Sequence, residues 1–161
     1  MLLKKYKKMP GLSNIYLEKL SKKLNLGYFM GVFSSDSLPN VNKSRSFSLI
    51  CNFSKQKDPG THLIAILCRN KNVFYFDSYG LPCYNPLILK FLKKLKKIVY
   101  YNSKTIQARD SIYCGYYALA CCTAFENDNI QNFLNIFTHR PTNKNENICI
   151  KYLINMFKQA K

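Results

Sequence analysis

The segment that most constrains the fold is CGYYALACCTAF, residues 114–125, in which almost every side chain is apolar. A helix that is hydrophobic on all sides has no face for water, so other elements must cover it. A chain of 161 residues can bury roughly 68–70% of its unfolded surface, which is enough for a core without metal or disulfide support. We therefore expect residues 1–161 to form one domain with this helix at its centre.

The segments that can surround this helix indicate a small mixed β-sheet, drawn from residues 44–107. Two apolar segments, 61–68 and 72–80, are separated by three polar residues, which predicts a hairpin of two buried strands. Further strand pieces are predicted at 44–54, Ile98–Tyr101 and Thr105–Gln107. An aromatic stretch and turn-rich loop at 28–40 precedes the sheet, and helices are predicted at 13–24, 86–97, 130–137 and 147–157, with a loop at 138–146.

A strongly basic amphipathic helix is predicted from Asn85 and Pro86, which supply a cap and a first-turn proline. Its apolar residues form one stripe: Ile88, Phe91, Leu92 and Leu95. Its other faces carry lysines: Lys90, Lys93, Lys94, Lys96 and Lys97. The whole chain has 25 Lys+Arg against 8 Asp+Glu, a formal charge of +17, which favours a polyanionic partner. We expect nucleic acid to bind these lysines; the alternative is a lysine-rich solvated surface.

Two classes of protein are disfavoured by the same sequence. The seven cysteines contain no C-x-x-C pair and only two histidines accompany them, so a zinc site is not expected and no metal or small-molecule cofactor is indicated. The first residues lack the apolar run of a signal peptide, and no stretch approaches the roughly 20 apolar residues of a membrane span. An intracellular, reducing environment with mostly free thiols is therefore expected.

Four residues together predict thiol chemistry. Cys114 begins the apolar helix, where unpaired N–H groups and the helix dipole favour a thiolate. His62 opens one strand of the predicted hairpin and Asp77 ends the other, so the two can hold an imidazole beside a carboxylate. Gln107 precedes the loop before the helix and can donate to an oxyanion. We expect Cys114 as nucleophile, His62 as base, Asp77 as its orienting group and Gln107 in the oxyanion hole.

Other residues are weaker candidates for this chemistry. His139 is the other possible base, but it follows the nucleophile in a polar loop. Cys121 and Cys122 fall within the apolar helix and are expected to serve core packing.

These residues resemble the family of adenain, the adenovirus maturation protease, with the SUMO-specific proteases as more distant relatives. The resemblance lies in four blocks that together extend over most of residues 26–126: GYFMGVF, GTHLIAI, YFDSYG and IQARDSIYCGYYALACC. It implies an α+β, papain-like cysteine protease fold, with the sheet packed on the Cys114 helix. It also implies viral structural precursors as substrates, cut beside small residues, in the host nucleus or the assembling virion.

The sequence departs from this family at several positions. Leu63 follows the histidine where the family usually has Trp, so one wall of the cleft must be built differently. Asp77 replaces the Glu of adenain, as in the SUMO proteases. The family implies DNA and a disulfide-linked activating peptide as cofactors. However, the position that corresponds to the linking cysteine falls at about Lys96, which cannot form a disulfide. Cys83 is left as a remote substitute for that cysteine.

Two other functions stay open on the sequence. One is a protease that removes SUMO or another ubiquitin-like tag, which would need a cleft fitted to a Gly-Gly tail. The other is a non-catalytic DNA-binding protein on the same fold. The presence of a thiol, an imidazole and a carboxylate in the required order disfavours the second function, because packing does not require this combination.

Overall fold

The structure is a computed structural model and describes residues 11–160. Residues 1–10, in which we expect no signal peptide, lie outside the described residues. The centre of the fold is a five-stranded sheet in the order β1-β2-β3-β4-β5. The strands are β1 (Phe29–Ser34), β2 (Phe47–Asn52), β3 (Leu63–Arg69), β4 (Asn72–Phe76) and β5 (Ile98–Tyr101). The edge strands pair in parallel and the inner strands pair antiparallel, so the sheet is mixed, as predicted.

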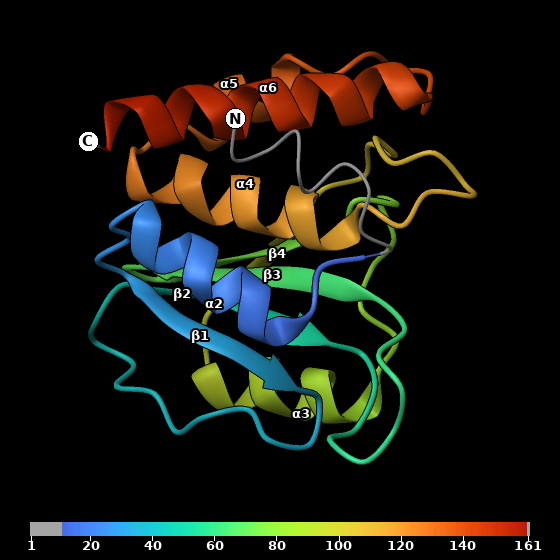
Figure 1. The fold of residues 1–161 in the computed structure, drawn as a ribbon. Coiled ribbons are helices and arrows are strands. Elements are labelled where there is room, and N and C mark those ends of the chain that lie inside the picture. Colours follow the sequence, from blue (N-terminus) through green and yellow to red (C-terminus); the bar gives the residue numbers. More distant parts are fainter. Residues whose placement is uncertain (1–10, 161) are drawn as a thin grey trace.

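The apolar helix predicted as the centre of the core is α4, Cys114–Glu126. Every residue from Gly115 to Phe125 in it is buried. It lies between the sheet and a further helical layer, formed by α5 (Ile130–Asn135) and α6 (Asn143–Gln159), while α2 (Asn14–Lys23) covers the same face of the sheet beside it (Figure 1). Coverage from both sides explains why this helix needs no polar face.

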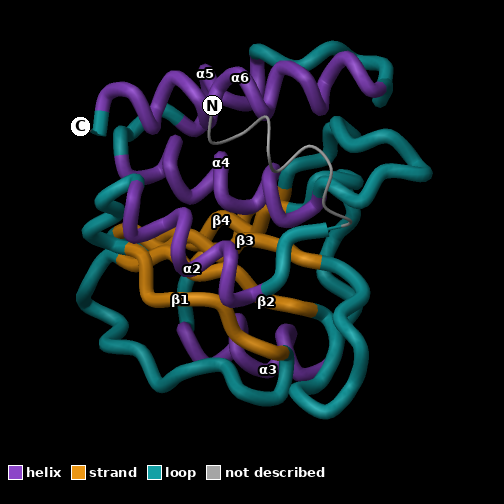
Figure 2. The backbone as a smooth tube through the Cα atoms, viewed as in Figure 1, coloured by secondary structure: helices purple, strands orange, loops and turns teal. Residues whose placement is uncertain are grey.

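The opposite face of the sheet is covered by α3, Pro86–Leu95 (Figure 2). Asn85 caps this helix, because its side chain accepts the N–H groups of Leu87 and Ile88. The helix buries the four residues of its predicted apolar stripe: Ile88, Phe91, Leu92 and Leu95. Along β3, alternate residues pack toward α4 and toward α3, which makes the whole strand apolar.

The sequence predictions were wrong in three places. Residues 29–34, an aromatic stretch placed outside the predicted sheet of 44–107, form its strand β1; the register of β1 shifts between Phe29 and Val32, which obscures the alternation of a strand. Thr105–Gln107 is not a strand, because the N–H groups of Ile106 and Gln107 both donate to the Ser78 carbonyl instead of to a neighbouring strand. Helix α6 begins four residues before the predicted start, since Thr142 caps a polar first turn that carries no apolar signal.

Candidate active site

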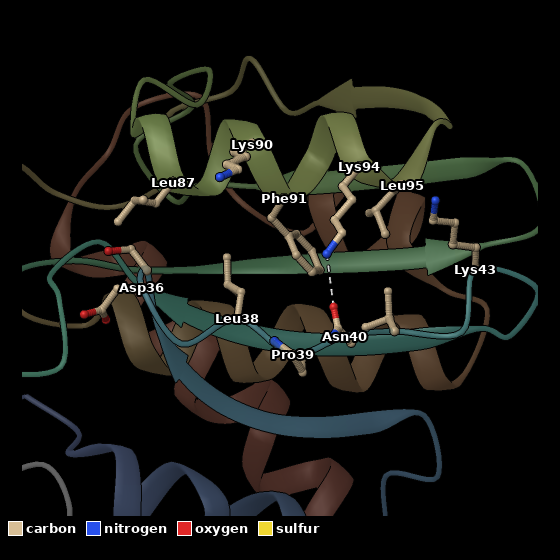
Figure 3. Close-up of a pocket in the computed structure, with 12 residues that line it drawn as sticks. Asp36, Leu38, Pro39, Asn40, Lys43, Leu87, Lys90, Phe91, Lys94 and Leu95 are labelled. Atoms are coloured by element: carbon tan, nitrogen blue, oxygen red, sulfur yellow. Dashed lines mark hydrogen bonds between the residues drawn. The ribbon is translucent and has the colours of Figure 1, made fainter.

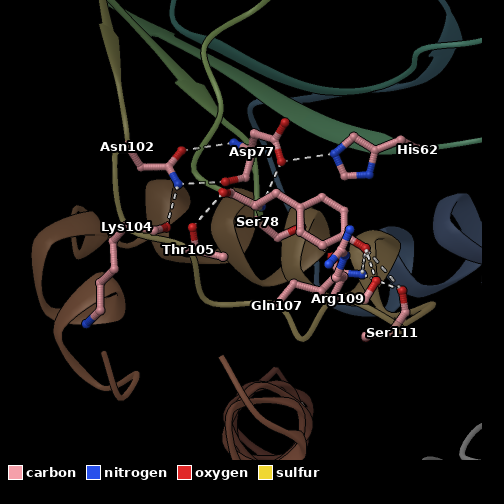
Figure 4. Close-up of polar contacts among 10 residues, drawn as sticks. His62, Asp77, Ser78, Asn102, Lys104, Thr105, Gln107, Arg109 and Ser111 are labelled. Carbon is pink, nitrogen blue, oxygen red and sulfur yellow. Dashed lines mark hydrogen bonds and ion pairs between the residues drawn. The ribbon is translucent and has the colours of Figure 1, made fainter. Parts of the chain in front are cut away.

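Asp77 follows β4 directly and its carboxylate is buried. Its Oδ1 atom lies 3.0 Å from His62 Nε2 and accepts the backbone N–H of Tyr79 at 2.8 Å. The side chain of Asn102 fixes the Asp77 backbone by accepting its N–H at 2.9 Å and donating to its carbonyl at 2.6 Å (Figure 4). These bonds leave the carboxylate little freedom, so it presents one oxygen to the imidazole.

His62 lies immediately before β3, with its ring between two aromatic neighbours. The ring stacks on Phe53 at 5.5 Å between centroids and lies 5.2 Å from the ring of Tyr79. Because Nε2 faces Asp77, Nδ1 is the nitrogen left for Cys114. Burial by itself would lower the pKa of His62, but hydrogen bonds to Asp77 and Cys114 and the charges of both groups raise it from 6.5 to about 9. The imidazole is therefore held ready to carry a proton.

Cys114 is the first residue of α4 and is partly exposed, with its thiol within hydrogen-bonding reach of His62. Tyr113 caps the helix without a side-chain hydrogen bond, and its carbonyl accepts the N–H groups of Tyr116 and Tyr117. The remaining thiols are all buried: Cys51, Cys68, Cys83, Cys121, Cys122 and Cys149. Cys114 therefore differs from them in exposure and in having an imidazole partner.

Burial also disfavours the thiolate form of several of these thiols, and the thiolate is the nucleophile. Burial raises the pKa of Cys51 to about 12 and raises the pKa values of Cys121, Cys122 and Cys149 above the ordinary range. A thiol in such surroundings stays protonated at neutral pH and reacts slowly.

Gln107 is buried, and its side-chain amide is oriented from both ends. Its Oε1 accepts the Ser78 hydroxyl at 2.5 Å, and its Nε2 donates to the Ser111 carbonyl at 2.7 Å. A second, longer bond of 3.2 Å runs from Nε2 to the Tyr79 hydroxyl. The Ser111 carbonyl can only accept, so the amide atom bonded to it is the nitrogen, and the oxygen end faces the Ser78 hydroxyl.

The residues predicted as catalytic meet at one cleft of about 690 Å³. Cys114, His62 and Gln107 line it together with Tyr79, and Asp77 lies behind His62. Further lining comes from the loop before His62, residues 55–61, and from residues 11–14 before α2. The thiol, the imidazole and the amide therefore line the same cleft, a grouping that acyl transfer requires.

Three residues of this site were missed on the sequence. Asn102 fixes the Asp77 backbone, and Ser78 orients the Gln107 amide. Tyr79 is hydrogen-bonded to both Asp77 and Gln107. The only sequence signal for them is their position beside predicted residues at the strand ends. His139, the rival base, is exposed and is absent from the described lining of the cleft, which fits the choice of His62.

The lysines predicted to bind nucleic acid lie along α3 and in the two residues that follow it. Lys90 and Lys94 line a hollow of about 290 Å³ against residues 35–43, where Lys94 Nζ donates to Asn40 Oδ1 at 3.1 Å (Figure 3). Lys97 Nζ donates to the carbonyl of Asn70 in the β3–β4 turn. Lys93 and Lys96 are exposed, and Lys96 ends the helix in a left-handed conformation. The five lysines therefore have different surroundings, and Lys94 and Lys97 already have partners within the protein.

Neither a metal-binding cluster nor a membrane-spanning helix is found among residues 11–160. No group of three or more His, Cys, Asp or Glu side chains there could hold a metal ion. Within the same range, no helix has the length and apolar character needed to cross a membrane.

Comparison with known proteins gives little further guidance. No protein-family model matches the chain, and no curated protein matches it. Among the solved structures that match is one described as "AvrA delL154 with IP6, CoA", at 18% sequence identity and a TM-score of 0.40. The match covers 91% of this chain and 66% of that chain. A likeness of this degree carries no conclusion about activity, so the function has to be inferred from the site.

Proposed function

We propose that the chain is a cysteine endopeptidase with Cys114 as nucleophile. The observation that carries the proposal is the chain of contacts from Asp77 Oδ1 to His62 Nε2 and on to the Cys114 thiol, at the edge of a cleft. Each partner has a distinct chemical role, because the carboxylate orients the imidazole and the imidazole takes the thiol proton. Gln107 adds an amide donor at the same cleft.

The first half of the reaction forms a thioester. The Cys114 thiolate attacks the scissile carbonyl carbon, a C–S bond forms, and the carbonyl π electrons move to oxygen. The N–H groups of the Cys114 backbone and the Gln107 side chain stabilise this oxyanion. The His62 imidazolium then donates its proton to the leaving amine as the C–N bond breaks.

The second half regenerates the enzyme. A water molecule gives a proton to neutral His62 and attacks the thioester carbonyl. The tetrahedral oxyanion collapses with loss of the Cys114 thiolate, releasing the acid product. The imidazolium formed in this step again neighbours the thiolate, with Asp77 accepting its Nε2–H.

The substrate class and cofactors of the proposal rest on the resemblance to adenain. We propose viral structural precursors, cut beside small residues in the host nucleus or the virion, with DNA and an activating peptide as cofactors. The formal charge of +17 supports the nucleic-acid part, since a polyanion would concentrate such a protein on its substrate particles. The basic segment α3 supports the same part.

The proposal is tested with purified protein on a panel of substrates. The panel contains peptides and precursor-type proteins with Gly-containing cleavage sites, and fusions that carry SUMO or ubiquitin. We expect cleavage of the precursor type, abolished in Cys114→Ala and His62→Ala and retained in Cys121→Ala. Selective cleavage of the tagged fusions would identify a deconjugating protease instead. Cleavage that survives Cys114→Ala would refute the proposal.

A further inference from the structure

Tyr79 contacts three of the four proposed site residues, although no role follows for it from the sequence. Its backbone N–H donates to Asp77 Oδ1 at 2.8 Å, and its ring lies 5.2 Å from the His62 ring at an interplanar angle of 33°. Its hydroxyl accepts the longer bond from Gln107 Nε2 at 3.2 Å. One side chain therefore joins the acid–base half of the site to the oxyanion half.

The loop that carries Tyr79 is fixed to the segment that carries Gln107. Thr105 Oγ1 donates to the Tyr79 carbonyl at 2.8 Å, and the Ser78 carbonyl accepts the N–H groups of Ile106 and Gln107. Tyr79 also lines the catalytic cleft and is half-buried. Its hydroxyl and ring thus have defined positions relative to both halves.

The two bonds of the Gln107 amide nitrogen are unequal. The bond to the Ser111 carbonyl is 2.7 Å long, whereas the bond to the Tyr79 hydroxyl is 3.2 Å long. The Tyr79 hydroxyl itself reaches acceptors only at 3.4 Å, the carbonyls of Arg109 and Ser111. The short bond holds the amide in place, and the long bond engages the second N–H weakly enough for a stronger, charged acceptor to replace it.

We propose that Tyr79 is a positioning residue of this site. Its ring holds the imidazole of His62, and its hydroxyl directs the second Gln107 N–H until the oxyanion replaces it. This inference rests on the proposed function, since it assigns Tyr79 a part in the same reaction. Tyr79 acts through His62 and Gln107 and takes no proton itself.

The hydroxyl is tested by Tyr79→Phe, which keeps the ring. We expect kcat to fall about threefold to tenfold, the scale of one neutral hydrogen bond, with KM and the alkaline limb of the pH profile unchanged. The loss should vanish when Tyr79→Phe is combined with Gln107→Ala, because the hydroxyl acts through that amide. Additive losses, or a loss confined to KM, would overturn this part.

The ring is tested by comparing Tyr79→Leu with Tyr79→Phe. Leucine removes the aromatic neighbour of His62 as well as the hydroxyl, so its kcat should fall further. Phenylalanine should recover the difference. Equal rates in the two variants would show that the ring does not hold the imidazole.

A measurement without substrate separates this inference from the proposed function. The two side-chain N–H signals of Gln107, assigned by their loss in Gln107→Glu, are followed by ¹H–¹⁵N NMR. Tyr79→Phe should shift one signal and leave the other, bonded to Ser111, in place; the exposed Tyr84→Phe is the control. If both signals stay unchanged, the Tyr79 inference fails even if the chain is a peptidase. If the one signal shifts as expected but Cys114→Ala stays active, the proposed function alone fails.

Discussion

Gln107 is the residue at which the oxyanion hypothesis can be examined most directly. Gln107→Ala should lower kcat by roughly 10²–10³ with little change in KM, because the lost donor acts mainly in the transition state. Gln107→Glu keeps the size of the side chain but removes its N–H groups, and should lose as much. The exposed Gln131→Ala on α5 is the matched control and should keep full activity. An unchanged kcat in both Gln107 variants would remove this residue from the site.

His62 predicts the alkaline side of the pH dependence. Its raised pKa of about 9 means that the imidazolium is the stable form at neutral pH and is lost as the pH rises through about 9. The leaving amine then lacks its proton donor, so kcat/KM should fall above that pH.

Asp77→Asn tests whether the Asp77 carboxylate is what raises the pKa of His62. Without the carboxylate, the pKa of His62 should drop and the alkaline limb should move to lower pH, with a lower maximal rate. The measurement is kcat/KM from pH 5 to 10 for both proteins. An alkaline limb that stays in place in the variant would show that Asp77 does not set the charge of His62.

At the scale of elements, the strongest sequence patterns predicted the structure well. An all-apolar helix and two apolar strands around a three-residue turn each have few alternatives, and α4 and the β3–β4 hairpin lie where they were predicted. Strand β1 was missed because its irregular register hides the alternation of apolar residues. The position of Gln107 in a non-strand segment depends on bonds to Ser78, a partner 29 residues away, which local patterns do not encode.

The turn after β4 is the element that joins the two halves of the site. Gly80 has φ +70°, and an added Cβ would lie 2.8 Å from the backbone carbon of Lys104 and 2.9 Å from the nitrogen of Thr105. Gly80→Ala should therefore cost about 2–4 kcal/mol of unfolding free energy, through left-handed strain and a backbone clash. Because Asp77 and Tyr79 belong to this turn, activity should fall as well.

Gly60→Ala is the control for that substitution. Gly60 has no positive φ, and the nearest atom to its added Cβ, at 2.6 Å, is the side-chain amide nitrogen of Asn52 rather than a backbone atom. Chemical denaturation of both variants gives the comparison. Equal losses of unfolding free energy in the two variants would contradict a specific clash between a Cβ at position 80 and the backbone of residues 104–105.

At the scale of the whole molecule, the charge of +17 predicts salt-dependent binding to DNA. The log of the association constant should fall linearly with log salt, with a slope of about −0.9 per neutralised phosphate. Lys90→Glu with Lys93→Glu should flatten the slope by about 2 units without changing hydrolysis of a small peptide. Both lysines are exposed, whereas Lys94 and Lys97 already have partners in the protein.

The same charge change elsewhere separates a local site from a general effect. Lys144→Glu with Lys151→Glu alters two exposed lysines of α6. This pair should change the slope of log association constant against log salt much less than the α3 pair does. Anionic liposomes test whether a lipid surface attracts the α3 lysines equally. If DNA at physiological salt neither binds nor changes cleavage of a protein substrate, the basic balance is only a solvated surface.

The proposed reaction depends on activation of the Cys114 thiol by His62. The most direct measurement is limited alkylation with iodoacetamide at neutral pH, followed by peptide mass spectrometry of all seven cysteines. We expect Cys114 to be labelled first in the wild-type protein and to lose that advantage in His62→Ala, while the buried thiols stay unmodified in the folded protein. Preferential labelling of Cys121 or Cys122, or equally fast labelling of Cys114 without His62, would contradict activation of Cys114 by His62.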